Sequence, residues 1–146
     1  MGAEVNDPHG GEYSLDDQVG FLLRLANQRH TTIFQAHTLH GLTPTQFTAL
    51  IRVAEQGECS QNHLGRLAAM DVATIKGVVD RLREKGLITI KPAPHDRRRS
   101  LISLSPEGAE LIGPLREVGH RITQETLQPL TASEQRNLLK ILRKIC

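Results

Sequence analysis

Apolar residues recur at every third or fourth position in six stretches of the chain, which is the spacing of helices with one buried face. Each stretch starts at a residue type that caps helix N-termini, and these residues are Ser14, Thr43, Ser60, Asp71, Ser105 and Thr131. The first helix is expected to run to about His40. Two short apolar runs, Leu87–Ile90 and Leu101–Leu104, flank a Pro-rich segment and predict a β-hairpin. The pattern therefore predicts a mainly α (α+β) fold of four helices, two strands and two further helices.

A short helix, a tight turn, a longer helix and a hairpin, in that order, are typical of the DNA-binding winged helix-turn-helix. The charge distribution points the same way. From Lys76 to Arg99 the chain has eight Lys or Arg and three acids, a net charge of +5, whereas the whole chain carries +2. We therefore expect the helix that starts at Asp71 to enter the major groove of DNA, with the hairpin beside it as the wing.

The outward face of this helix and the basic tip of the hairpin provide the candidate contacts to double-stranded DNA. Thr74 and Lys76 are expected to reach base edges, and Gly77 to allow close approach to the groove floor. Arg81 is expected to meet phosphate. Phosphate contacts are also expected from Ser60, Gln61, Asn62, Arg97 and Arg99. The alternative for all of these residues is an ordinary solvated surface.

The first and last helices carry more apolar residues than one buried face of a small domain needs. The last helix has Leu138, Leu139, Ile141, Leu142 and Ile145. Such a wide apolar face predicts a surface that pairs with a second copy of the chain.

The chain is thus expected to form a homodimer and to divide into four parts. These are an acidic arm at 1–13, a first dimerisation helix at 14–42, a DNA-binding lobe at 43–104 and C-terminal dimerisation helices at 105–146. Pro114 is expected to kink or interrupt the fifth helix.

Composition narrows the classes of function. Aromatic residues make up 3% of the chain, which disfavours recognition of single strands by stacking. No apolar run approaches ~18 residues and no secretory signal is evident, so no membrane span and a cytoplasmic location are expected. Cys59 and Cys146 make no disulfide framework or zinc spacing. No phosphate loop, nucleophile elbow or metalloprotease motif is present, so we expect neither an enzyme nor a cofactor.

Four segments of the sequence carry a family resemblance. Asp96-Arg97-Arg98, followed by ISLSPEG at 102–108, is similar to a wing signature D-x-R, spacer, L-T-x-x-G. Residues 79–88 (VDRLREKGLI) are similar to the end of a recognition helix, and 42–47 (LTPTQF) and 130–134 (LTASE) to two helix starts. In this order and spacing, over about residues 15–145, the segments resemble the MarR family of bacterial winged helix-turn-helix transcriptional regulators.

The resemblance implies a homodimeric repressor that binds a pseudo-palindromic operator. It assigns Arg98 to the minor groove, with Asp96 orienting it, and a narrow A·T-rich groove attracts such an Arg. Ser105 stands where the family usually has Thr, and either residue can cap a helix. Lys76-Gly77 stands where many relatives have Thr or Ser followed by Arg, so individual base contacts do not carry over.

Relatives in this family often bind small aromatic acids or phenols between the dimerisation helices and the DNA-binding lobe. The candidate effector-binding residues in this chain are Arg24, Arg29, His30, His37 and His40. Imidazole suits a carboxylate or phenolate ligand. Two alternatives stay open for the histidines: structural partners within the protein, or a metal site at the i, i+3 pair His37 and His40.

Two other functions also stay open. A winged helix can serve protein–protein contacts instead of DNA binding. The second alternative is a regulator that responds to oxidation through Cys59. Cys59 lies close to the start of the third helix, where a reactive thiolate is favoured. The family's peroxide sensors carry a cysteine near the start of the first helix, and this chain has none before Cys59.

Overall fold

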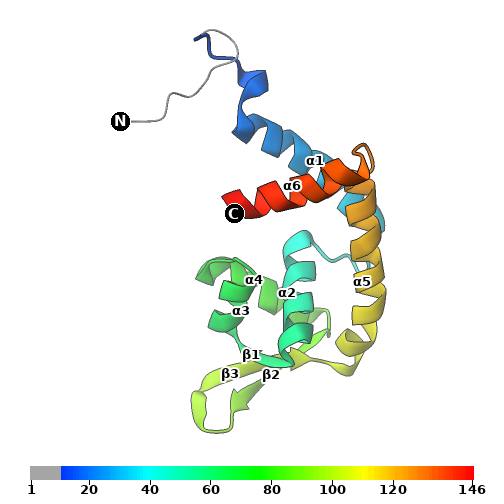
Figure 1. The fold of residues 1–146 in the computed structure, drawn as a ribbon. Helices are drawn as coiled ribbons and strands as arrows, with labels where there is room; N and C mark the ends of the chain where they lie inside the picture. The colour runs from blue at the N-terminus through cyan, green and yellow to red at the C-terminus, as the bar shows by residue number, and fades with distance from the viewer. Residues whose placement is uncertain (1–10) are drawn as a thin grey trace.

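The computed structural model describes residues 11–146, and in it one long helix joins a lobe that holds the small sheet to two projecting helices (Figure 1). The elements are η1 Leu15–Asp17, α1 Val19–His37, α2 Pro44–Gln56, β1 Glu58–Ser60, α3 Gln61–Leu67, α4 Val72–Glu84, β2 Ile88–Ala93, β3 Asp96–Leu104, α5 Pro106–Leu127 and α6 Ala132–Ile145. Most of the acidic arm expected at 1–13 lies outside the described residues.

Five of the six expected N-caps are confirmed by side-chain hydrogen bonds. Thr43 and Thr131 form full capping boxes with Gln46 and Glu134. The side chains of the other three caps accept a hydrogen bond from the backbone N–H three residues on, and these caps are Ser60, Asp71 and Ser105. Each accepts one of the N–H groups that a helix leaves unpaired at its start.

The expected bounds of the first helix are wrong at both ends. Ser14 makes no side-chain cap; a single 3-10 turn follows it, and α1 starts after Gln18. The Gln18 side chain instead donates to the Ser14 carbonyl oxygen at 3.0 Å. At the other end α1 stops at His37, because Thr38 leaves the helical conformation with ψ 152°. His40 and Gly41 then both have positive φ, +53° and +63°, and turn the chain towards α2.

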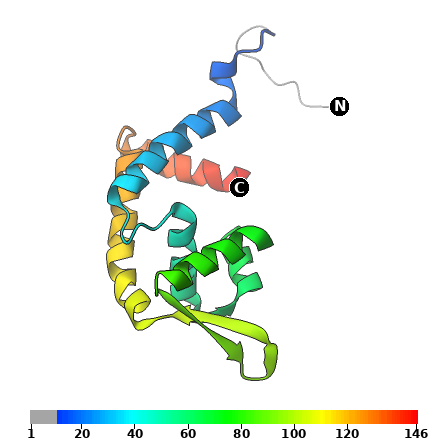
Figure 2. The same cartoon turned by 180° about the vertical axis from the view of Figure 1, so that it is seen from behind.

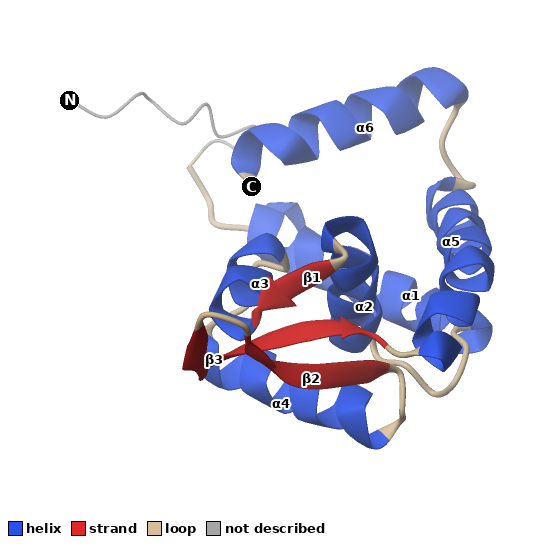
Figure 3. Cartoon of the chain, turned by 90° about the horizontal axis from the view of Figure 1, so that it is seen from below, coloured by secondary structure: helices blue, strands red, loops and turns tan. Residues whose placement is uncertain are grey.

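The sheet has three antiparallel strands in the order β1-β3-β2, where the sequence predicted only a hairpin (Figure 3). In the third strand, β1, Cys59 lies opposite Ile102. Strands β2 and β3 are longer than expected, and Asp96 to Arg99 form the start of β3 rather than the tip. The regular pairing reaches Pro92 opposite Ser100, and after a register shift Ala93 lies opposite Asp96. Pro92 is tolerated because β2 is an edge strand, where a proline removes no inner ladder bond.

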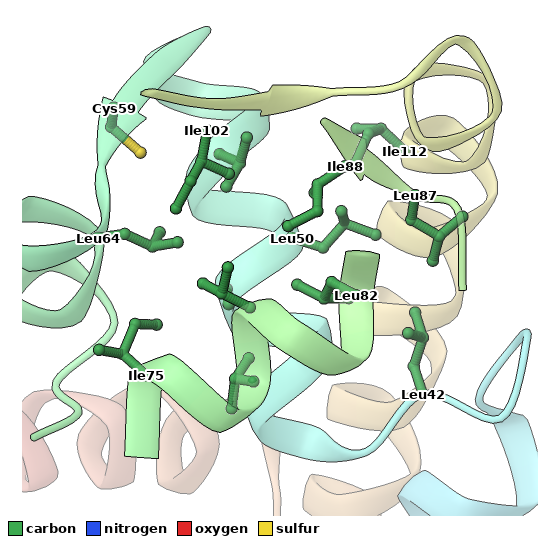
Figure 4. Close-up of a cluster of buried hydrophobic side chains, with 14 of the residues drawn as sticks. Leu42, Leu50, Cys59, Leu64, Ile75, Leu82, Leu87, Ile88, Ile102 and Ile112 are labelled. Atoms are coloured by element: carbon green, nitrogen blue, oxygen red, sulfur yellow. The ribbon is translucent and has the colours of Figure 1, made fainter. Parts of the chain in front are cut away.

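The core of the lobe lies between the sheet and helices α2, α3 and α4 (Figure 4). Leu50, Leu64, Leu82 and Ile102 are among its fully buried side chains. The first half of α5 belongs to the same core, to which it contributes Leu111, Ile112 and Leu115. The second half of α5 packs Val118 and Ile122 on Phe34 of α1.

Helix α5 thus runs through both parts of the molecule. It continues unbroken through Pro114, so the expected interruption is absent from it. The proline leaves the carbonyl of Glu110 without its helical donor, and both residues are exposed to water, which can replace that donor.

The two projecting helices, α1 and α6, meet the far end of α5 (Figure 2). Both expose apolar side chains. No residue of α6 is buried. The exposed large apolar residues in this part of the molecule are Tyr13, Leu15, Val19, Leu22, Leu23, Leu25, Leu139, Ile141 and Ile145. Among the described residues, no helix is long and apolar enough to cross a membrane.

Candidate nucleic-acid interface and effector groove

Helix α4 presents the outward face that its sequence predicted. Ile75, Val78, Val79 and Leu82 point into the core, whereas Thr74, Lys76, Gly77 and Arg81 are exposed. A Cβ placed on Gly77 would have no heavy atom within 4 Å. No side chain projects at Gly77 in the middle of α4, so a DNA groove can approach the helix closely there.

The two cations on this face have acidic partners that the prediction of DNA contacts left out. Lys76 Nζ lies 3.2 Å from Asp80 Oδ2, and Arg81 NH1 lies 3.2 Å from Glu84 Oε2. Their i, i+4 and i, i+3 spacings were the signal in the sequence. All four side chains are at least half exposed, and such pairs contribute only ~0–1 kcal/mol. A phosphate or a base can displace the carboxylates at little cost.

The start of α3 and the wing form one polar hollow of about 440 Å³. Most of the predicted DNA-contacting residues outside α4 lie together here. The hollow is lined by Ser60, Gln61, Asn62, Arg66, Arg98, Arg99 and Ser100. Arg66 was not predicted, although its place one turn after Asn62 on α3 indicated it. Arg97 does not line the hollow. Three guanidinium groups around one hollow give a surface suited to a phosphate backbone.

Asp96 organises the wing through the backbone. Its Oδ1 accepts a hydrogen bond from the backbone N–H of Arg98 at 3.0 Å. The side chains of Arg97, Arg98 and Arg99 are exposed. The contact holds the chain direction at Arg98, and with it the starting point of the Arg98 side chain, as an Asx-type turn does.

Three of the five candidate effector residues converge on the C-terminal end of α5. Arg29 donates to the carbonyl oxygens of Thr126 and Glu125 at 2.5 and 2.8 Å. His30 Nδ1 lies 2.9 Å from Thr126 Oγ1, and His37 Nε2 lies 3.0 Å from Glu125 Oε1. These contacts join α1 to the end of α5, where the guanidinium of Arg29 binds the Thr126 carbonyl and shares the Glu125 carbonyl with the backbone N–H of Gln128.

His30 also lines a mainly apolar groove of about 350 Å³ between α1, α5 and α6. The groove is lined by Leu23, Ala26, Asn27, His30, Thr123, Thr126, Leu127, Leu138, Leu139 and Leu142. An apolar groove with a few polar groups, here the imidazole, the threonine hydroxyls and the Asn27 amide, suits a small aromatic molecule.

His40 lies apart from this groove. It follows the end of α1, beside Glu107, Glu110 and Pro114 of α5, and its carbonyl oxygen accepts a hydrogen bond from Lys85 Nζ at 2.9 Å. His40 therefore does not continue the face of α1 that carries His30 and His37, because α1 ends before it. In the described part of the chain, no cluster of three potential ligands could hold a metal ion.

Comparisons with known proteins agree with this geometry. The model of the MarR family matches residues 40–99. The HTH-type transcriptional repressor NicR of Pseudomonas putida is 38% identical over 134 residues, which cover 91% of this chain and 85% of NicR. The chain belongs to the MarR family. It is therefore a DNA-binding transcriptional regulator and not an enzyme.

Solved structures extend the match to the MarR-type fold. A probable transcriptional regulator from Pseudomonas aeruginosa has a TM-score of 0.88 and 48% identity, and the match covers 91% of this chain and all of that one. BpsR of Bordetella bronchiseptica, whose DNA binding is regulated by 6-hydroxynicotinic acid, has a TM-score of 0.86 and 38% identity, over 92% of this chain and 97% of BpsR. Six helices and a small antiparallel sheet are thus the fold of the family and of this member.

Cys59 of this MarR-family chain is buried in the lobe core. It is 5% exposed and packs in the same cluster as Leu64 and Ile102. Burial raises the pKa of its thiol above the ordinary value, which disfavours the reactive thiolate.

Proposed function

We propose that this MarR-family member is a homodimeric repressor that binds a pseudo-palindromic operator and is released by a small aromatic carboxylic acid or phenol. It acts in the cytoplasm, where the DNA of a bacterial cell lies. The observation that carries the proposal is the basic surface formed by α4, the start of α3 and the wing, beside a separate apolar groove at the far end of α5.

The exposed apolar faces of α1 and α6 support the homodimer. They form a patch that the described residues of one chain leave open to water, and pairing with a second copy would bury it. A two-fold axis near these helices presents the two DNA-binding lobes symmetrically, with half-sites about one helical turn apart. Residues 43–104, with the first half of α5 packed on their core, then act as the DNA-binding lobe.

Within each lobe, Thr74, Lys76 and Gly77 of α4 face base edges and Arg81 faces phosphate. Arg98 enters the minor groove from the wing, held by the bond between Asp96 and its own backbone. Backbone phosphates are contacted by Ser60, Gln61, Asn62, Arg66, Arg97 and Arg99. The hydroxyl of Ser60 is already used as the cap of α3, so its phosphate contact is through the helix start.

The groove beside His30 is the proposed effector site. Its walls are apolar, and His30 and Thr126 provide hydrogen-bonding groups at one end. Arg24, which follows the groove residue Leu23 in the sequence and is exposed on α1, supplies a cation for a carboxylate. Arg29 and His37 act indirectly, by joining α1 to α5. The ligand named for BpsR, a hydroxylated aromatic acid, has the chemistry that this groove would bind.

The DNA-binding part of the proposal is tested by selecting 30-base-pair duplexes from a random pool with the full-length protein. We expect a palindromic sequence, and an affinity that falls steeply with salt as counterions are released. Weak binding that does not depend on salt would instead favour a winged helix that contacts proteins.

The effector part is tested with 6-hydroxynicotinic acid and benzoic acid on wild type, His30→Ala and His40→Ala. A ligand that binds the folded state raises its melting temperature by mass action. We expect an increase in wild type and in His40→Ala, whose imidazole lies outside the groove, and none in His30→Ala. An equal increase in all three proteins would move the effector site away from the groove.

A further inference from the structure

Val72, the first residue of α4, is a large apolar side chain in an unexpected place. It is 71% exposed. The other exposed large apolar side chains of the described chain lie between residues 13 and 25 or on α6, on the proposed dimer surface. Neither the core of the lobe nor the pairing of two chains accounts for Val72.

The position of Val72 places it on the surface that faces DNA. It precedes Lys76 by one helical turn, so the two side chains lie on the same strip of α4. Val72 also borders a hollow of about 380 Å³ between α3 and the start of α4, which Asn62 and Arg66 line from α3. The N-terminal residues of a recognition helix are those that contact base edges.

Val72 is the largest apolar side chain in the first turn of α4, whose other exposed methyl groups belong to Ala73 and Thr74. The Asp71 carboxylate accepts the backbone N–H of Thr74 at 2.7 Å and serves as the helix cap. Ala73 adds only a methyl group. The apolar group that a base pair shows in the major groove is the C5-methyl of thymine, and apolar side chains recognise it by contact.

We propose that Val72 is a specificity-determining residue that contacts the methyl group of one thymine in each half-site. The contact favours thymine over cytosine or uracil at that position, because neither of these bases carries the methyl. This inference rests on the proposed function, since it requires α4 to lie in a major groove.

The test combines a change in the protein with a change of one methyl group in the DNA. The duplex selected by the wild-type protein is remade with uracil in place of thymine at one symmetric pair of positions at a time. Losing a buried methyl contact is expected to weaken wild-type binding by about 4-fold per half-site. In Val72→Ala the same uracil duplex should bind within about 2-fold of the thymine duplex, because the partner group is already gone.

The remaining thymines of the duplex provide matched controls, at which both proteins should respond equally to uracil. Val72→Ala should fold, since the side chain is exposed and alanine favours a helix; circular dichroism checks this. The inference is wrong, while DNA binding stands, if uracil weakens the affinity of wild type and of Val72→Ala by the same factor at every position. It is also wrong if uracil changes the affinity of wild type at no position. If wild type selects no sequence at all, the proposed function is wrong as well.

Discussion

Replacing Gly108 by alanine tests a close backbone contact where the wing meets α5. A Cβ on Gly108 would lie 2.0 Å from the carbonyl oxygen of Leu87, whereas real Cβ contacts essentially never fall below 3.0 Å. The two segments must therefore separate by about 1 Å. Ser105 ties them together, because its N–H donates to Leu87 O at 3.0 Å and its hydroxyl to Gly86 O at 2.6 Å.

The expected destabilisation follows from these contacts. Overpacking costs about 1–3 kcal/mol, and weakening two hydrogen bonds costs about 1 kcal/mol for each. Against this, alanine gains up to ~1 kcal/mol over glycine in a helix. We therefore expect Gly108→Ala to lower the free energy of unfolding by about 2–4 kcal/mol.

Gly113 on the same helix provides the matched control. A Cβ there meets no heavy atom within 4 Å, so Gly113→Ala should raise the free energy of unfolding by about 0.5–1 kcal/mol. Urea denaturation followed by circular dichroism, at one protein concentration for all variants, measures both changes. If Gly108→Ala stays within about 0.5 kcal/mol of wild type, the steric argument is refuted.

Three further predictions concern the wing, the cysteines and the cap of α4. Arg98→Ala should weaken binding to the selected duplex by about 1–3 kcal/mol; unchanged affinity in a gel-shift titration at fixed salt would contradict the wing assignment. The buried, raised-pKa thiol of Cys59 should react with iodoacetamide far more slowly than the exposed Cys146, as mass spectrometry of the labelled peptides can measure, and equal rates would reopen redox control. The hydrogen bonds from Thr74 lower the pKa of Asp71, so its carboxylate stabilises the fold above the ordinary pKa of about 4 and loses this effect as pH falls through the lower folded value. Asp71→Asn should show a shallower loss of stability in acid than wild type, in urea titrations between pH 5 and pH 3, and an unchanged slope would count against the cap.

Local signals in the sequence were enough for most of the helices. Thr43, Thr131 and the other confirmed caps each act within four residues, so the pattern of cap and apolar stripe predicts where their helices begin. Strand β1 was missed because three residues show no periodicity, and its partners, Leu101 to Ser103, lie about forty positions further along the chain. Only the folded chain brings the two together.

The candidate sites show the same limit. The exposure of Lys76 and Gly77 follows from helical spacing, which the sequence displays. The contacts of Arg29 and His30 with Thr126 span 97 and 96 positions, and no local rule indicates them. The separation of His40 from His30 depends on the end of α1 before Thr38 and on the left-handed turn at His40 and Gly41. Helical spacing counted along the sequence continues through both and does not indicate them.

Because α5 is continuous, a small tilt at its effector end produces a larger displacement at its DNA-binding end. The helix has 22 residues, with the contacts of His30 and His37 at one end and the base of the wing at the other. At 1.5 Å per residue it is a lever about 33 Å long, and a tilt of about 6° displaces its far end by roughly 3.4 Å, one base-pair step. A ligand that wedges α1 away from α5 by a small angle would therefore put each lobe out of register with its half-site, without any rearrangement inside the lobe.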